Sequence, residues 1–119
     1  MRVAVLGASA KEERYSHQAV LRLKEAGHEV YPVNPALSEL AGLKVWPDLS
    51  ALRQNIDTVT VYLSAANSSG LADALCQLHP RRVIFNPGAE NSLLADKLRA
   101  AGIEVQLACT LVLLKTNQF

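Results

Sequence analysis

The sequence has few of the features that mark a protein bound to nucleic acid or to a membrane. Only 5% of its 119 residues are aromatic, and no stripe of aromatic and basic side chains is present on which single-stranded bases could stack. The formal net charge is +1, whereas proteins that bind nucleic acid through its phosphates carry a clearly basic surface. No apolar run approaches the ~18 residues of a membrane span. We therefore expect neither a nucleic acid nor a membrane as partner.

Metal-binding and export patterns are also missing. The two cysteines, Cys76 and Cys109, and the three histidines show no spacing typical of a metal site. The N-terminal residues form too short an apolar run for a signal peptide. We expect a cytoplasmic protein with reduced thiols, no bound metal, and cysteines that serve the structure.

The chain does contain enough apolar residues for a core, since half of it is hydrophobic and 19% is charged. Its length predicts one domain over residues 1–119. Apolar runs predict strands, and helical spacing with Ser16 and Asn91 as N-caps predicts helices. The expected strands are 3–6, 30–33, 58–63, 83–85 and 103–107, the expected helices are 16–26, 71–79 and 91–101, and 111–114 is a last helix or an edge segment.

Strands that alternate with helices predict the α/β class: a three-layer, doubly wound, Rossmann-like parallel sheet of about five strands. Residues 36–56 are the least regular part, and we expect a helical turn at 37–40 and another turn capped by Asp48 or Ser50. In such sheets ligands bind at the carboxyl ends of the strands. The loops to search for function therefore begin at Gly7, Asn34, Ser64, Asn86 and Ala108.

The loop after the first predicted strand has the composition of a phosphate site. A glycine there lets the backbone approach a phosphate closely, and the following amides and the Ser9 hydroxyl can donate hydrogen bonds to it. The next helix points its positive end at the same place. An ordinary strand-to-helix turn with surface charges remains an equal alternative. The candidate binding residues of this loop are Gly7, Ala8, Ser9, Lys11, Arg14 and Tyr15.

Two further turns lie at the same expected edge of the sheet. Asn34 and Pro35 end the second strand, and Pro35 offers a rigid apolar wall on which an adenine could rest. Asn86, Pro87 and Gly88 end the fourth strand and could border a pocket. Both segments also favour turns by composition, so a purely structural role stays open for each. No nucleophile, base and acid form a readable set, and we expect a protein that is not an enzyme.

Several segments together carry a family resemblance, whose most specific part lies in residues 1–50. They are Val3 to Ser9, Lys11, Arg14, Tyr15, Val33 to Pro35, Gly42, Pro47 to Leu49, Asp57 to Tyr62, Gly88 to Asn91, Gly102 and Cys109. This pattern resembles the stand-alone CoA-binding domain family. Those small proteins are similar to the CoA-binding domain of succinyl-CoA synthetase and of ADP-forming acyl-CoA synthetases.

The resemblance implies a Rossmann-like sheet that binds coenzyme A in an extended pose. The loop from Gly7 to Ser9 would contact the diphosphate, and Lys11 and Arg14 would neutralise phosphates, including the 3′-phosphate. Asn34 and Pro35 would border the adenosine. The loop after Leu63, which includes Ser64, and the turn from Asn86 to Gly88 would line the path of the pantetheine arm.

The sequence also departs from the family's pattern. Leu63-Ser64 stands where the family commonly has arginine and proline, and Ile84 and Asn86 stand where it has tryptophan and glutamine. Leu107-Ala108 replaces an acidic and basic pair before Cys109. The apolar residues after Cys109 predict a buried contact, and we expect a homodimer through the C-terminal segment 111–119.

Three functions are consistent with these observations. The first is a non-catalytic module that binds CoA or an acyl-CoA. The second is a protein-interaction domain with a degenerate nucleotide pocket. The third, an NAD(P)-binding redox protein, is disfavoured because the first loop has one glycine in place of three and because Asn34 stands where an acidic residue usually binds the ribose.

Overall fold

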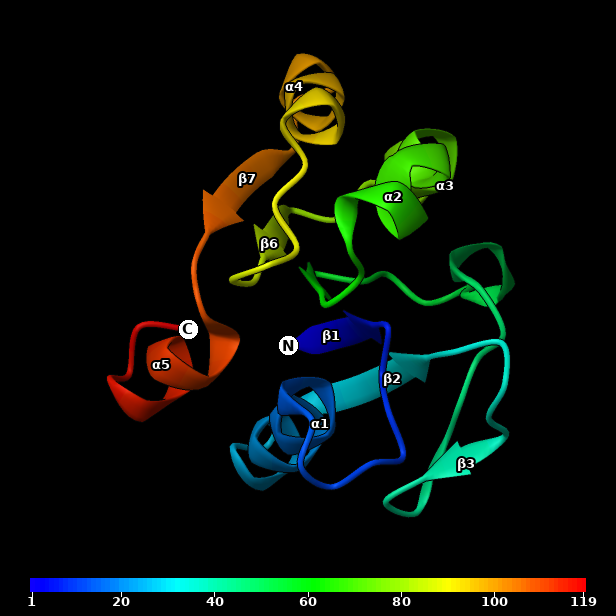
Figure 1. The fold of residues 1–119 in the computed structure, drawn as a ribbon, viewed down its shortest axis with the longest axis vertical. Helices are drawn as coiled ribbons and strands as arrows, with labels where there is room; N and C mark the ends of the chain where they lie inside the picture. The colour runs from blue at the N-terminus through cyan, green and yellow to red at the C-terminus, as the bar shows by residue number, and fades with distance from the viewer.

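A parallel sheet of five strands forms the centre of the structure, a computed structural model that describes residues 1–119 (Figure 1). All neighbouring strands are parallel, so the expected α/β class and Rossmann-like sheet are confirmed. The strands, in their order across the sheet, are β2 (Glu29–Val33), β1 (Arg2–Leu6), β5 (Thr58–Val61), β6 (Arg82–Phe85) and β7 (Glu104–Leu107).

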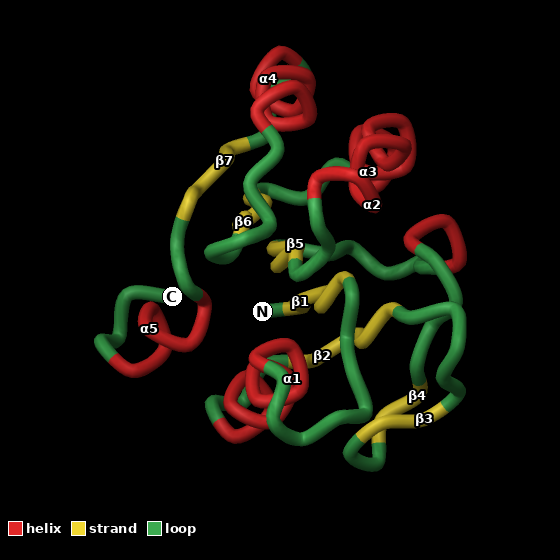
Figure 2. The backbone as a smooth tube through the Cα atoms, in the orientation of Figure 1, coloured by secondary structure: helices red, strands yellow, loops and turns green.

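Helices cover both faces of this sheet and complete the three layers (Figure 2). On one face α1 (Tyr15–Glu25) packs beside α5 (Thr110–Lys115), and on the other α3 (Ala72–Leu78) packs beside α4 (Ser92–Ala100). A short helix, α2 (Ala65–Ser68), and a 3-10 turn, Ser69–Leu71, precede α3, and another 3-10 turn spans Leu49–Ala51. No helix is long and apolar enough to cross a bilayer.

Alternation along the strands explains why the sheet has a core on each face. Val3 and Val5 of β1 belong to the core beneath α1, whereas Ala4 and Leu6 belong to the larger core beneath α3 and α4. All four side chains are at most 5% exposed. Because a central parallel strand is covered on both faces, it has a continuous apolar sequence rather than an alternating one.

The helical turn expected at 37–40 is wrong. A hairpin forms there instead, in which β3 (Glu39–Leu40) pairs antiparallel with β4 (Leu43–Lys44). Its two-residue loop, Ala41 and Gly42, has positive φ at both positions (51° and 78°), as in the tight turns that suit the twist of a hairpin. Trp46 then forms a parallel bridge with Val33 at the open edge of β2.

The first helix also begins differently from the expectation. Arg14, not Ser16, is the N-cap residue, and its side chain forms no capping hydrogen bond. Ser16 lies inside the helix and is 5% exposed. Asn91 and Asp48 do accept the capping hydrogen bonds predicted for them.

Candidate functional site

Two hollows meet at Gly7, directly after β1. The chain order reverses between β1 and β5 in this sheet, and ligands of open α/β sheets bind at such a point. The apolar hollow, of about 200 Å³, is lined by Leu6, Gly7, Val33, Asn34, Pro35, Pro47, Asp48, Leu49, Leu63, Asn67 and Leu71. The loop hollow, of about 280 Å³, is lined by Gly7, Ser9, Arg14, Tyr15, Ser16, Tyr62 and Pro87.

Gly7 occupies a position at which a side chain would clash with a neighbouring residue. Its φ is +88°, and a Cβ atom placed there would lie 2.9 Å from Cδ2 of Leu63. Its amide and that of Ala8 both donate to the carbonyl of Val33, at 3.1 and 3.2 Å. The turn is therefore tied to β2, and neither of these two amides is free to bind a phosphate.

The free hydrogen-bond donors lie further along the loop. The amides of Ser9 and Ala10 have no partner in the protein. The first amides of α1, at Tyr15, Ser16 and His17, are also free, because a helix leaves its first donors without intrahelical acceptors and no side chain caps this one. The loop hollow thus opens onto unpaired donors and the positive end of a helix dipole, which favours an anion.

Two cations of this loop are available to such an anion. Lys11 and Arg14 are exposed, and neither forms an ion pair with an acidic side chain. Arg14 lines the loop hollow, whereas Lys11 lies outside its lining. The shape of the loop is fixed by His17, whose Nδ1 donates to the carbonyl of Ser9 at 2.8 Å.

Asn34 lines the apolar hollow, but its side-chain amide forms hydrogen bonds within the protein and offers no free donor or acceptor group to a ligand. Its Nδ2 donates to the carbonyl of Ala8 at 2.6 Å, and its Oδ1 accepts from the amide of Ala36 at 2.7 Å. Both ends of the amide are therefore in use. Pro35 lies beside it, exposed, and contributes the apolar wall that was predicted from the sequence.

Asn86 is also engaged by the protein. It is 2% exposed, and its Nδ2 donates to Oγ1 of Thr60 at 2.7 Å and to the carbonyl of Val61 at 2.9 Å. Its Oδ1 accepts from the amide of Thr110 at 2.8 Å. Asn86 thus joins β5 to the first residue of α5, and it forms no part of either hollow.

Of the remaining predicted residues, one lines a hollow and three do not. Pro87 lines the loop hollow beside Tyr15. Ala8 is completely buried, Ser64 caps α2, and the amide of Gly88 donates to Glu90 at 2.9 Å. None of these three lines a hollow.

The sequence reasoning missed several residues that the fold brings to the site. Asp48, Leu49, Asn67 and Leu71 line the apolar hollow. They come from the irregular segment after β2 and the short helices after β5, where no periodic pattern indicates which side chains face inward. The resemblance to the family already included Asp48 and Leu49, and this was the only signal that could have pointed to them.

Tyr62 was also missed, and it is one of the residues that line the loop hollow. Its hydroxyl lies near those of Thr60 and Thr110 but forms no hydrogen bond of good geometry. Burial raises the pKa of Tyr62 to about 12. The phenol is therefore protonated at neutral pH and cannot act as a base there.

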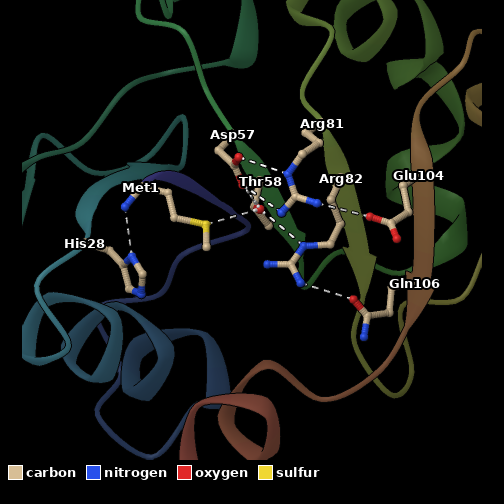
Figure 3. Close-up of polar contacts among 8 residues, drawn as sticks. All are labelled: Met1, His28, Asp57, Thr58, Arg81, Arg82, Glu104 and Gln106. Carbon is tan, nitrogen blue, oxygen red and sulfur yellow. Dashed lines mark hydrogen bonds and ion pairs between the residues drawn. The ribbon is translucent and has the colours of Figure 1, made fainter. Parts of the chain in front are cut away.

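A second polar cluster lies at the opposite, amino-terminal edge of the strands (Figure 3). Arg81 pairs with Asp57 and Glu104 at 3.1 and 3.3 Å. The neighbouring Arg82 is only 6% exposed; it donates to Thr58 and Gln106, and its Nη2 has no partner. Since this edge faces away from both hollows, the cluster belongs to the framework of the sheet.

Comparison with known proteins assigns the chain to a family. The model of the CoA binding domain family matches residues 1–115. The chain belongs to this family. Its predicted resemblance to the CoA-binding domains is therefore confirmed.

Individual relatives agree with this assignment. An uncharacterised Bacillus subtilis protein, YneT, is 35% identical over 72 residues, which are 60% of this chain and 53% of that protein. The ADP-forming acetate–CoA ligase of Methanocaldococcus jannaschii is 29% identical over 59 residues, 50% of this chain and 8% of the ligase. The crystal structure of an uncharacterised protein is 37% identical and superposes with a TM-score of 0.93 over 99% of this chain and 97% of that one. The chain thus spans about half of YneT and under a tenth of the ligase.

The places where this CoA-binding domain departs from its family's pattern have different structural consequences. Leu63, which stands in place of an arginine, lies against Gly7 and lines the apolar hollow. Ile84 is fully buried and serves the core. Leu107 is 61% exposed at the edge of the sheet. Only the change at position 63 therefore alters the lining of a hollow.

Proposed function

We propose that this domain binds coenzyme A or an acyl-CoA without catalysing a reaction on it. One observation carries the proposal: an apolar and a polar hollow meet at Gly7, at the switch point of the sheet, in a chain of the CoA-binding domain family. The adenine would lie in the apolar hollow against Pro35, and the diphosphate would lie beside Gly7. The pantetheine arm would leave the site past Tyr62 and Pro87.

The chemistry of the lining supports binding without catalysis. No histidine, cysteine or lysine lines either hollow, and Asp48 is the one carboxylate. Tyr62 is the one buried titratable group, and its raised pKa keeps it protonated. A module of this kind would buffer, sense or present the nucleotide to a partner.

Calorimetric titration of the protein with CoA, acetyl-CoA, NAD and AMP tests this function. We expect CoA and acetyl-CoA to bind and NAD to bind at least tenfold more weakly. At 100 times its dissociation constant a ligand stabilises the folded state by about 2.7 kcal/mol, which a thermal shift detects independently. Absence of binding by CoA and acetyl-CoA in both assays would overturn the proposal, and tight binding of NAD would replace it with the redox alternative.

Substitution of Arg14 tests the role assigned to the loop hollow. Arg14→Ala should weaken CoA binding by at least tenfold, because it removes a charge-assisted contact to phosphate. Arg22→Ala is the matched control: it removes the same charge from the same helix, about 12 Å further along its axis, where Arg22 pairs with Glu25. Equal affinities of the two variants would contradict the placement of the diphosphate.

A second candidate function rests on two exposed apolar residues, Leu107 in β7 and Val112 in α5. Leu107 is 61% and Val112 54% exposed, and β7 has an open edge. We propose a second copy of this chain as the partner, as expected from the apolar C-terminal segment. Light scattering after size exclusion should show a dimer, and Val112→Asp should yield a folded monomer. A monomeric parent protein would refute this interface and leave the CoA proposal unaffected.

A further inference from the structure

Arg82, at the amino-terminal edge of the strands, is a buried cation whose hydrogen-bond donors are largely unused. Only 6% of the residue is exposed. Its Nε donates to Oγ1 of Thr58 and its Nη1 to Oε1 of Gln106, both at 3.3 Å, whereas Nη2 has no partner. A guanidinium carries five N–H groups, and these bonds use only two of them. Figure 3 shows the guanidinium extending from β6 toward the side of Met1 and His28.

No carboxylate pairs directly with Arg82. The acidic residues that act on its charge, Asp57 and Glu104, both pair with Arg81, at 3.1 and 3.3 Å. The hydroxyl of Thr58 accepts from Arg82 and donates to Oδ1 of Asp57 at 2.6 Å, so that carboxylate reaches Arg82 only through a neutral group. Burial and the charge of Arg81 lower the pKa of Arg82, but a guanidinium stays protonated at neutral pH. A buried charge without a direct counter-ion is unfavourable.

The ring of Phe119 covers this guanidinium. Its centroid lies 4.7 Å from Cζ of Arg82 and 5.3 Å from the centroid of the His28 ring. The preceding residue is tied to α5, because the amide of Gln118 donates to the carbonyl of Leu113 at 2.7 Å. The amide of Phe119 forms no hydrogen bond. The ring is therefore held by its packing contacts alone, and rotation about the bonds of this one residue would give access to the guanidinium.

We infer that Arg82 binds a small oxyanion, an inorganic phosphate or a carboxylate group, and that the ring of Phe119 gates access to it. The free N–H groups on Nη2 and Nη1 form a fork that matches two oxygens of such an anion. The anion supplies the direct counter-ion that the neutral side chains of Thr58 and Gln106 do not provide. Because this edge of the sheet lies opposite the two hollows, the inference does not depend on the binding of CoA.

Nuclear magnetic resonance tests the site through the side-chain Nε–H signal of Arg82, which Arg82→Met identifies by its loss. The parent protein is titrated with phosphate, acetate and chloride at constant ionic strength. We expect the signal to shift and saturate with the two oxyanions. Chloride should bind at least fivefold more weakly, since it lacks the paired oxygens that match the fork. The tighter of the two oxyanions shows whether the site prefers a phosphate or a carboxylate group.

The same signal measures the role of the covering ring. Phe119→Ala should tighten phosphate binding at least threefold, because the anion no longer competes with the closed position of the ring. Leu93→Ala, which removes an exposed apolar side chain from α4, is the matched control and should leave the affinity unchanged. Arg14→Ala should also leave it unchanged, which separates this site from an anion bound in the loop hollow.

Each negative outcome has a distinct meaning. A signal of Arg82 that responds to neither oxyanion would overturn the inference, because Nη2 would then be reached by water alone. A response to chloride as strong as that to phosphate would overturn the assignment of an oxyanion. Equal affinities in Phe119→Ala and the parent protein would contradict the gating role. All of these leave the proposed function standing, and failure of CoA to bind in the calorimetric titration would leave the anion site standing.

Discussion

Replacement of Gly7 by alanine should destabilise the protein for two separable reasons. Its φ of +88° lies in the left-handed region, which costs a residue with a Cβ atom about 1–2 kcal/mol. The new Cβ would also lie 2.9 Å from Cδ2 of Leu63. Turning Leu63 away from its rotamer to relieve that contact costs about 0.5–1.5 kcal/mol. The expected loss is therefore about 2–3 kcal/mol, or roughly 10 °C in the thermal midpoint at ~4 °C per kcal/mol.

Urea unfolding followed by far-ultraviolet circular dichroism measures this loss. Gly70→Ala is the matched control, since Gly70 has no positive φ and a Cβ there would meet no atom within 4 Å; its stability should change by less than ~0.5 kcal/mol. The variant Gly7→Ala with Leu63→Ala should recover the part due to the contact, so the two changes should couple by about 0.5–1.5 kcal/mol. A loss below ~1 kcal/mol, or no coupling, would refute the reasoning.

Three other substitutions test the framework around the site by the same unfolding assay. Asn34→Ala should cost about 2 kcal/mol, because two hydrogen bonds of the Gly7 turn are lost; Asn34→Asp should cost as much, since its carboxylate would face the carbonyl of Ala8. Burial disfavours the charged form of Asp57, but the bonds from Arg81 and Thr58 outweigh it and lower its pKa. The stability that Asp57 contributes is thus present above about pH 4 and is lost as the pH falls through the lowered pKa. Asp57→Asn should flatten this dependence of the free energy of unfolding on pH. Arg82→Met should leave stability within ~1 kcal/mol or raise it, because it removes a buried charge with an unpaired donor; a loss above ~3 kcal/mol would contradict this.

The fold was readable from the sequence because its strands are short, continuous apolar runs. The segments that become β1, β5 and β6 have no polar face, as expected for central strands of a parallel sheet. The hairpin at Glu39–Lys44 escaped prediction because its turn depends on a positive φ at Ala41, a conformation that alanine rarely adopts. Ser16 was wrongly taken as the N-cap because the helix is capped two residues earlier, at Arg14, so that Ser16 lies in the first turn and is buried.

The location of the site followed from topology, whereas the roles of its residues did not. Parallel strands bring their carboxyl ends to one edge, so the loops at Gly7, Asn34 and Pro87 were expected to meet, and they do. Which side chains remain free for a ligand depends on hydrogen bonds between segments far apart in the chain. The bond from Asn34 to Ala8 and that from Thr110 to Asn86 are of this kind.

The two asparagines show why polar residues at strand ends are ambiguous in such a fold. Where a parallel strand stops, the next backbone donors and acceptors lose their ladder partners, and burial of an unpaired group costs about 1–3 kcal/mol. An amide side chain carries a donor and an acceptor at once, so Asn34 and Asn86 can each join two neighbouring segments. Because the amide groups of these two asparagines are already used within the protein, they have no free group with which to discriminate between ligands. In the proposed site, recognition would therefore depend on groups that the framework does not use, namely the free amides of the first loop and the side chain of Arg14.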